Sequence, residues 1–146
     1  MRPSKHIYFL RIATIVATRS TCQRRSVGCV LVDKDDHIIS TGYNGVPSGK
    51  PHCNEDTPCS GNHSVSGENL NSCEALHAEV NAVAHCENPK RIHIAYVTVS
   101  PCMSCMKLLL ATGCEIVIAT EIYNKEAVLY WNLNNKKFGT LNKEDN

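Results

Sequence analysis

Two short segments constrain the fold of this chain most strongly: His77-Ala78-Glu79 and Pro101-Cys102-Met103-Ser104-Cys105. One imidazole and two thiolates form a ligand set that binds zinc and leaves its fourth position open. A water at that position has its pKa lowered towards neutrality, to roughly 7 in well-studied zinc enzymes. Glu79 lies too close to His77 in the sequence to be an obvious fourth ligand, and it is better placed to carry protons. The pattern therefore predicts a zinc site that activates water.

Both segments are expected at the start of a helix. Leu76 to His85 is rich in helix-forming residues, and its apolar residues Val80, Val83 and Ala84 are predicted to share one face. Pro101 favours helix initiation, and the apolar run Met106 to Ala111 follows it. The positive end of each helix dipole then favours thiolate over thiol and stabilises the metal site.

Each half of the pattern is ambiguous when it is taken alone. A lone His-x-Glu is common, and a lone C-x-x-C can be a redox pair or half of a structural zinc site. The redox interpretation leaves His77 and Glu79 unexplained. A zinc-stabilised binding module without catalysis has no use for a proton carrier at Glu79, so this residue separates the enzyme hypothesis from the binding-module hypothesis.

Length and charge favour one compact domain that binds a small molecule. The chain has 146 residues, 42% of them hydrophobic, which is enough for a single core spanning residues 1–146. Its net charge of +1 lacks the basic excess typical of proteins that bind RNA or DNA along the backbone. No segment is long and apolar enough to cross a membrane. We therefore expect neither a nucleic acid polymer nor a membrane as partner.

The N-terminal residues are expected to form a helix of the domain rather than a signal peptide. Arg11 interrupts the apolar stretch, and Arg19 stands where a small-residue cleavage site would lie. The expected location is therefore cytoplasmic. The helix is predicted to begin near Ser4 and to bury the apolar residues Tyr8, Ile12, Ile15 and Val16.

The strand pattern predicts an α/β fold with helices on both faces of a sheet. Val27 to Asp33 and His37 to Tyr43 flank Lys34-Asp35-Asp36, which is a typical hairpin turn. Ile92 to Val99 and Glu115 to Thr120 are two further strands, separated by a helix that makes them parallel neighbours. A last helix is expected over residues 124–134.

Nine cysteines in a chain without an export signal point to metal binding rather than disulfides. Cys29, Cys86 and Cys114 lie in or beside apolar runs and are expected to be small buried hydrophobic residues. The loop 44–73 has no helical or strand periodicity, and a second metal could order it. The alternative is that its cysteines and histidines are free and solvated, because their spacing is irregular. The candidate ligands are Cys22, His52, Cys53, Cys59, His63 and Cys73.

Further segments match a known family: residues 20–28, Thr41 to Gly49, Pro51-His52-Cys53, Cys73 and His77 to Ala82. Together with the two motifs they make the sequence similar to the deoxycytidylate (dCMP) deaminases of bacteria and phages, from about residue 19 to 123. The zinc motif is shared by the whole cytidine deaminase-like superfamily, whereas the Gly-Tyr-Asn-Gly loop is more specific. The resemblance implies a three-layer α-β-α sandwich with a mixed sheet of four to five strands. A polar, loosely ordered tail over residues 132–146 leaves the fifth strand in question.

The resemblance also implies a reaction, the zinc-dependent hydrolysis of dCMP to dUMP and ammonia, which feeds thymidylate synthesis. Activated water attacks C4 of the cytosine ring, and Glu79 protonates N3 and then the leaving amine. Such enzymes are typically homohexamers that dCTP activates and dTTP inhibits. The alternative substrates are cytidine and adenosine in tRNA. The small net charge disfavours tRNA, and Arg24 with the Gly-Tyr-Asn-Gly loop favours a nucleotide over a nucleoside.

Residue roles follow from the same resemblance. It implies a structural zinc bound by Cys22, Cys53, Cys73 and Cys59, with His63 or His52 as substitutes. It places Asn44 at the sugar or base, the Ala78 N–H at the pyrimidine carbonyl and the Ser100 backbone at the exocyclic amine. The candidates for the 5′-phosphate are Arg24, Ser26 and Tyr123, with Arg25 as a further one. The effector loop is Gly42, Tyr43, Asn44, Gly45, Pro47 and Gly49. The plainer alternatives are a solvated arginine at 24, a turn residue at 44 and a fixed turn over the loop.

Overall fold

The computed structural model describes residues 1–22, 25–52 and 75–142. Within them lies a five-stranded sheet in the order β2-β1-β3-β4-β5. β1 pairs antiparallel with both β2 and β3, whereas β3, β4 and β5 run parallel, so the sheet is mixed as predicted. The strands are β1 (Gly28–Val32), β2 (Ile38–Tyr43), β3 (Ile94–Val99), β4 (Ile116–Glu121) and β5 (Lys137–Thr140).

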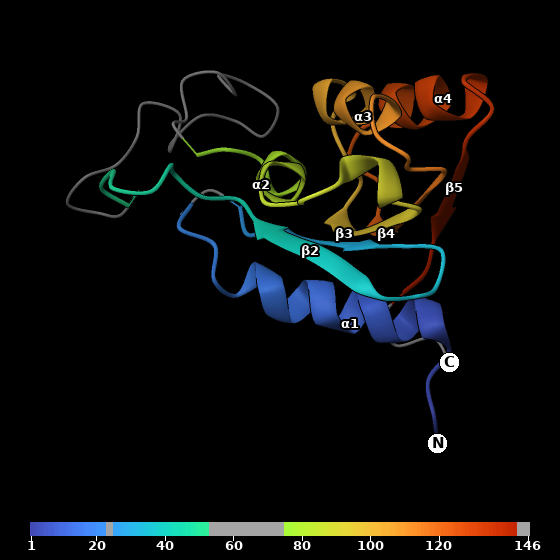
Figure 1. Cartoon of the computed structure of the whole chain (residues 1–146), viewed down its shortest axis with the longest axis horizontal. Coiled ribbons are helices and arrows are strands. Elements are labelled where there is room, and N and C mark those ends of the chain that lie inside the picture. Colours follow the sequence, from blue (N-terminus) through green and yellow to red (C-terminus); the bar gives the residue numbers. More distant parts are fainter. Residues whose placement is uncertain (23–24, 53–74, 143–146) are drawn as a thin grey trace.

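Helices cover both faces of the sheet, which confirms the three-layer arrangement (Figure 1). α1 (Lys5–Ala17) lies on one face. On the other face lie α2 (Ala78–Ala84), α3 (Met103–Leu110) and α4 (Lys125–Leu133), and a short 3₁₀ helix, η2 (Pro89–Arg91), leads into β3. Cys29, Cys86 and Cys114 are buried in the core on the α2–α4 side, as the sequence predicts. Among the described residues, no helix has the length and apolar character needed to span a membrane.

The fifth strand corrects the expectation of a loosely ordered tail over residues 132–146. β5 pairs in parallel with β4 over residues 137–140, and Phe138 packs against the core. The indole Nε1 of the buried Trp131 donates a hydrogen bond to the Lys137 carbonyl at 2.7 Å, which joins α4 to this strand. Local composition did not predict this strand, because pairing with β4 and the hydrogen bond from Trp131 hold it in place, and its residues do not alternate between apolar and polar.

α1 begins as predicted, because the Ser4 hydroxyl accepts a hydrogen bond from the Ile7 N–H. The predicted buried face is wrong for Tyr8 and Ile15, whose exposures are 50% and 69%. α1 carries apolar residues on all its sides, so periodicity could not identify the face that packs on the sheet. The close approach of β1 to α1 selects that face, since a Cβ on Gly28 of β1 would lie 2.7 Å from the backbone nitrogen of Ala17. The buried residues are Ile7, Phe9, Leu10, Ala13 and Ala17, with Ile12 and Val16 partly buried.

α2 also differs from its predicted face. Ala84 is exposed and Val80 and Val83 are only partly buried, whereas Ala78, Glu79 and Ala82 are buried. Gly42 of β2 explains this, because a Cβ there would lie 2.9 Å from the Cα of Ala82 and still closer to the Ala78 carbonyl oxygen. The small side of α2 therefore packs against the sheet.

Candidate active site

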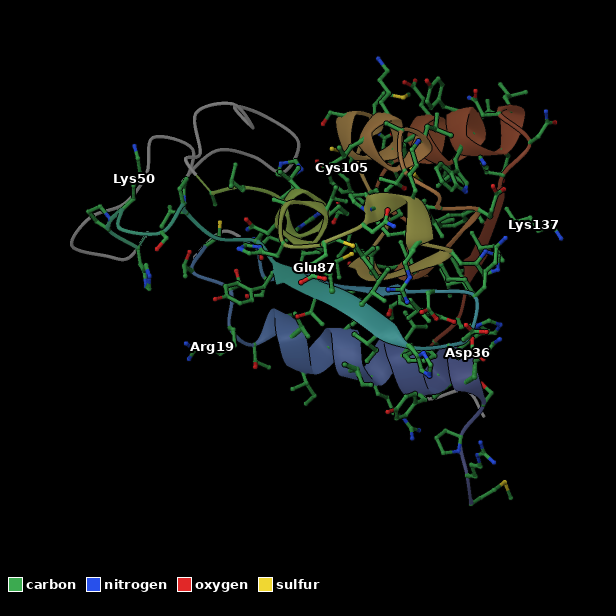
Figure 2. The ribbon with its side chains drawn as sticks, in the orientation of Figure 1. Arg19, Asp36, Lys50, Glu87, Cys105 and Lys137 are labelled. Carbon is green, nitrogen blue, oxygen red and sulfur yellow. The ribbon has the colours of Figure 1, made fainter. Side chains whose placement is uncertain are left out.

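Three potential metal ligands come together where α2 and α3 begin. His77 is the N-cap residue of α2, Cys102 is the N-cap residue of α3, and Cys105 lies in the first turn of α3. Their ligand atoms all lie within 4.8 Å of one another. The Nδ1 atom of His77 lies 3.3 Å from the Sγ of Cys105 and 3.5 Å from the Sγ of Cys102. Figure 2 shows Cys105 between α2 and α3.

This donor set fits zinc. Tetrahedral coordination with Zn–N and Zn–S bonds of about 2.0 and 2.3 Å requires nitrogen and sulfur ligands about 3.5 Å apart. The separations of 3.3 and 3.5 Å match that requirement without rearrangement of the helices. A zinc ion held by these three residues would supply Lewis acidity and lower the pKa of a water molecule.

The site already favours a thiolate. Hydrogen bonding from Cys105 is the main factor that lowers the pKa of Cys102 to about 3, and His77 and Ser104 act in the same direction. The pKa of Cys105 is raised because its hydrogen bond to Cys102 retains the proton. The pKa of His77 is raised, chiefly by its hydrogen bond with Cys102. Negative charge is therefore already favoured on the Cys102 sulfur.

Glu79 lies in the first turn of α2 and is 4% exposed. Burial raises the pKa of its carboxyl above the usual value, and the neighbouring Cys105 thiol opposes this shift. A buried carboxyl group whose pKa is raised holds a proton more readily than an exposed one, which suits a group that accepts a proton and passes it on. Glu79 thus has the environment of a proton carrier directly beside the donor set.

Ser100, the residue before the Pro-Cys motif, is bonded to the segment that contains Tyr123. The hydroxyl of the buried Ser100 accepts a hydrogen bond from the Tyr123 N–H at 2.8 Å, and the Ser100 N–H donates to the Glu121 carbonyl. The guanidinium of Arg25 lies over the Tyr123 ring, 4.4 Å from its centre. The structure therefore brings Arg25 to Tyr123. Ser26 is exposed, and Arg24 lies outside the described residues.

Asn44 is buried, and its side chain is engaged by the backbone. Its Oδ1 accepts a hydrogen bond from the Val27 N–H at 2.8 Å, and its Nδ2 donates to the Arg25 carbonyl. The residue therefore fixes the segment that carries Arg25 and Ser26. This role was not predicted, because nothing local in the sequence identifies backbone partners so far away. Ala78 is buried and contributes the first N–H of α2, a position without an intrahelical acceptor.

Most candidates for a second metal lie outside the described residues, namely Cys53, Cys59, His63 and Cys73. Cys22 is half-buried, and its N–H donates to the Ser20 hydroxyl at 3.2 Å. His52 is exposed. Within the described part of the chain, the His77, Cys102 and Cys105 group is the one cluster of three or more potential ligands.

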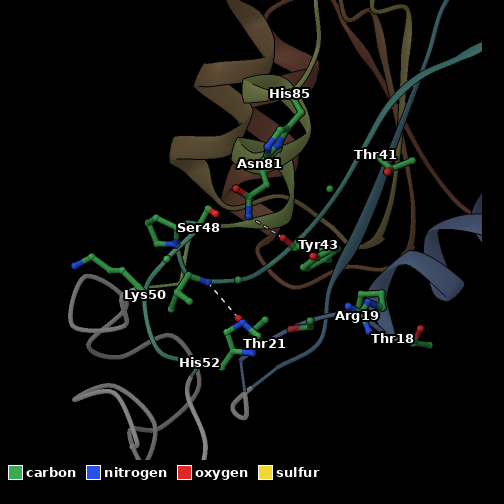
Figure 3. Close-up of a pocket in the computed structure, with 16 residues that line it drawn as sticks. Thr18, Arg19, Thr21, Thr41, Tyr43, Ser48, Lys50, His52, Asn81 and His85 are labelled. Carbon is green, nitrogen blue, oxygen red and sulfur yellow. Dashed lines mark hydrogen bonds between the residues drawn. The ribbon is translucent and has the colours of Figure 1, made fainter.

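A cavity of about 690 Å³ lies beside α2, where Asn81 and His85 contribute to its lining (Figure 3). Gly42, Tyr43, Gly45, Pro47 and Gly49 of the predicted effector loop contribute to its lining, and Asn44 is not among its described lining residues. None of the 16 residues drawn around it is acidic, while four belong to the basic residue types. These four, which no local pattern in the sequence assigns to an effector site, are Arg19, Lys50, His52 and His85.

Comparison with known proteins agrees with this architecture. Residues 3–121 match the family model of the cytidine and deoxycytidylate deaminase zinc-binding region. The chain is 40% identical over 132 residues to the deoxycytidylate deaminase of Mycobacterium phage D29, covering 86% of this chain and 98% of the relative. It is 38% identical over 129 residues to the deoxycytidylate deaminase of Schizosaccharomyces pombe, covering 86% of this chain.

A solved structure supports the fold. The dCMP deaminase of cyanophage S-TIM5, in complex with dCMP and dUMP, superimposes with a TM-score of 0.75 at 24% identity, over 97% of this chain and 99% of that one. The fold and donor set define a zinc-binding α/β domain, and the chain belongs to the cytidine and deoxycytidylate deaminase family. It spans about 40% of the length of its Schizosaccharomyces pombe relative and nearly the whole length of the mycobacteriophage one.

Proposed function

We propose that this chain catalyses the hydrolytic deamination of dCMP to dUMP with release of ammonia. The buried Glu79 carboxyl beside the His77, Cys102 and Cys105 donor set carries the proposal, because a metal that only stabilises a fold needs no proton carrier. The deoxycytidylate deaminases among the relatives support a cytosine nucleotide as substrate.

The reaction exchanges the amino group at C4 of cytosine for oxygen. Water gives its oxygen to C4, one proton to N3 and the other to the amino group, which leaves as ammonia. Glu79 accepts a proton from the attacking water, delivers it to N3 and then carries the second proton to the leaving group. The Ala78 N–H holds the pyrimidine carbonyl, and the Ser100 backbone faces the exocyclic amine.

The test is ammonia release from dCMP, dCTP, cytidine and cytosine by zinc-loaded protein. We expect turnover of dCMP to exceed that of cytidine and cytosine. Preference for cytidine would replace the proposal by nucleoside deamination. No release from any cytosine compound, with deamination of adenosine in tRNA, would replace it by tRNA editing. The product dUMP is the precursor of thymidylate, so the proposed role is in thymidylate supply.

The 5′-phosphate is proposed to bind where Arg25 meets Tyr123, with Arg24 and Ser26 as the sequence neighbours of Arg25. The support is the guanidinium held over the Tyr123 ring, because a fixed arginine binds a phosphate with little loss of side-chain freedom. Arg24→Ala and Arg25→Ala should each cost dCMP about 1.5–3 kcal/mol of transition-state binding if the residue pairs with phosphate. Deoxycytidine should be nearly unaffected. Equal losses on both substrates would show that the arginine serves the fold.

A second, structural zinc is proposed at Cys22, Cys53, Cys73 and Cys59, with His63 or His52 as substitutes. The supports are the unusual number of cysteines and histidines between residues 22 and 73 and the need of such a long loop for a cross-link. Elemental analysis of the purified protein should give two zinc ions per chain. A single zinc ion would remove this part of the proposal.

Regulation by dCTP as activator and dTTP as inhibitor is proposed to act at the 690 Å³ cavity. Its support is the lining, which includes Arg19 and Lys50 without a described acidic residue, because a triphosphate requires cations and exposed N–H groups. The glycines of the loop allow close approach of backbone to phosphate. We expect dCMP saturation curves to shift with dCTP and in the opposite sense with dTTP. If the nucleotides shift the dCMP saturation curves only by competing with dCMP at the active site, the loop is a fixed turn without a regulatory role.

A homohexamer is also proposed. Its support is the exposure of large apolar side chains on two helices, Tyr8 and Ile15 of α1 and Leu129 and Leu133 of α4, the last at 72%. Light scattering on a sizing column should give six times the chain mass of 16.1 kDa. A monomer at micromolar concentration would refute the assembly.

A further inference from the structure

The cavity wall is joined directly to the chain that carries the metal ligand. Gly45 and Leu76 form an isolated antiparallel bridge, in which the Leu76 N–H donates to the Gly45 carbonyl at 2.8 Å and the Gly45 N–H donates back at 3.1 Å. Leu76 immediately precedes His77 in the sequence. A displacement of the loop at Gly45 therefore acts on the residue next to a metal ligand.

Asn81 makes a second connection, through its side chain (Figure 3). Its amide donates a 2.8 Å hydrogen bond to the Tyr43 carbonyl, and the carbonyl, which can only accept, fixes the orientation of the amide group. The backbone N–H of Asn81 donates to the His77 carbonyl at 3.0 Å. One residue thus bonds both to the loop beside the cavity and to the carbonyl of the metal ligand.

The other end of α2 is tied to the same residue. The Nδ1 of His85, which also lines the cavity, lies 2.7 Å from the Asn81 carbonyl and must donate to it. Gly42 brings β2 into backbone contact with α2 at Ala78 and Ala82. The buried Glu79 lies between these contacts in the sequence, in the first turn of the helix that they hold.

From these contacts we infer that Asn81 is a positioning residue for the reaction. It fastens the loop 43–47 to the first turn of α2, so that the loop, His77 and Glu79 move as one unit. An anion seated in the cavity against this loop then changes turnover by shifting the catalytic turn, although it touches neither the metal ligands nor Glu79. This inference rests on the proposed deamination and deepens it by naming the physical connection between cavity and catalytic residues.

The first test compares turnover in zinc-loaded variants. Asn81→Ala removes the tether, and Asn81→Asp keeps its shape but turns the donor into an acceptor facing a carbonyl. For both we expect kcat for dCMP to fall about 3- to 10-fold, the range that one hydrogen bond supports, with KM and zinc content unchanged. Asn134→Ala is the matched control, because it removes a 2.8 Å hydrogen bond of the same kind, to the Tyr130 carbonyl of α4. Wild-type kcat in both Asn81 variants would overturn the inference.

The second test is hydrogen exchange, which does not depend on turnover. In the wild type, dTTP should slow exchange in the peptide covering residues 43–47 and in the one covering 75–81. In Asn81→Asp the slowing of the second peptide should be weaker than in the wild type, because only the Gly45–Leu76 bridge and the Gly42 contact remain. Slowing of the second peptide equal to that in the wild type would overturn the inference. Should dTTP fail to bind the wild type, the proposed regulation fails, and the kcat comparison alone decides the role of Asn81.

Should the wild type fail to deaminate dCMP, the proposed function fails. Hydrogen exchange without nucleotide then decides whether Asn81 positions the turn. Residues 75–81 must then exchange faster in Asn81→Asp than in the wild type and in Asn134→Ala. If neither Asn81 variant folds, hydrogen exchange of the wild type with dTTP still tests the inference. Slowing confined to residues 43–47 would overturn the inference, and joint slowing of both peptides supports it.

Discussion

The contact between Gly42 and α2 gives the most direct test of how the fold positions the catalytic residues. In Gly42→Ala, the new Cβ would lie 2.9 Å from the Cα of Ala82 and closer still to two backbone atoms of α2. Carbon atoms in contact lie about 3.5–4.0 Å apart, so α2 must retreat by at least roughly 0.6 Å. Overpacking of this kind costs about 1–3 kcal/mol of stability. His77 and Glu79 move with the helix.

A misplacement of about 1 Å can cost roughly 10²-fold in rate, so we expect kcat for dCMP to fall by about 10- to 100-fold in Gly42→Ala. The rate is measured at a temperature at which circular dichroism shows the variant fully folded, and with zinc content verified. KM should change less than kcat, because the loss concerns the alignment of the reacting groups.

Gly28→Ala provides the matched control. Its Cβ would lie 2.7 Å from the Ala17 nitrogen and closer still to the Ala13 carbonyl oxygen, a clash at least as severe, against α1 on the opposite face of the sheet. It should lower the melting temperature as Gly42→Ala does, yet leave kcat near the wild-type value. Gly139→Ala, with no atom within 4 Å of the new Cβ, should change neither. Equal rate losses in Gly28→Ala and Gly42→Ala, or wild-type kcat in Gly42→Ala, would refute the proposed coupling of β2 to the catalytic turn.

Three further predictions concern the proton carrier, the second metal and acid stability. Glu79→Gln should retain zinc and fold but lose about 10²- to 10⁴-fold in turnover of dCMP, and near-normal turnover at full zinc content would exclude proton transfer by Glu79. Cys73→Ala should remove one of two zinc ions and lower the melting temperature while the other zinc stays, as elemental analysis and calorimetry can check. The pKa of Asp33 is lowered, first by the hydrogen bond from the His37 N–H and also by the Asp35 N–H and the Arg91 guanidinium. Its carboxylate therefore stabilises the folded state at neutral pH and loses that effect as the pH falls below about 4. The melting-temperature difference between wild type and Asp33→Ala should therefore shrink between pH 7 and pH 3, and a difference that is constant with pH would contradict it.

The parts of the site that sequence could predict are those with a local signature. His77, Cys102 and Cys105 are recognisable because two helix starts impose their spacing, and the structure brings these residues together as expected. The hairpin at Lys34-Asp35-Asp36 is equally local, since Asp36 adopts a φ of 63° that aspartate tolerates in turns. Local sequence carries this information because the partners are a few residues apart.

Contacts between distant segments have no such signature. The side chain of Asn44 bonds to Val27, and that of Asn81 bonds to Tyr43, across 17 and 38 positions. From local sequence, an asparagine next to a glycine is predicted to be a turn residue, and an asparagine within a helix is predicted to have a solvent-exposed side chain. Only the pairing of β1 with β2 brings Asn44 to Val27, and only the packing of β2 against α2 brings Asn81 to Tyr43.

The glycines of the Gly-Tyr-Asn-Gly loop show what that packing requires. A side chain at Gly42 would separate β2 from α2, and one at Gly45 would meet the Thr21 hydroxyl at 3.0 Å, where the loop is also bonded to Leu76. Gly42 therefore preserves the close contact between β2 and the turn that follows His77, and Gly45 preserves a contact with Thr21 in the wall of the cavity. A loop needed only for flexibility could place its glycines anywhere along its length. Because Gly42 contacts α2 directly and Gly45 is bonded to Leu76, we expect the position of this loop to affect that of the catalytic turn.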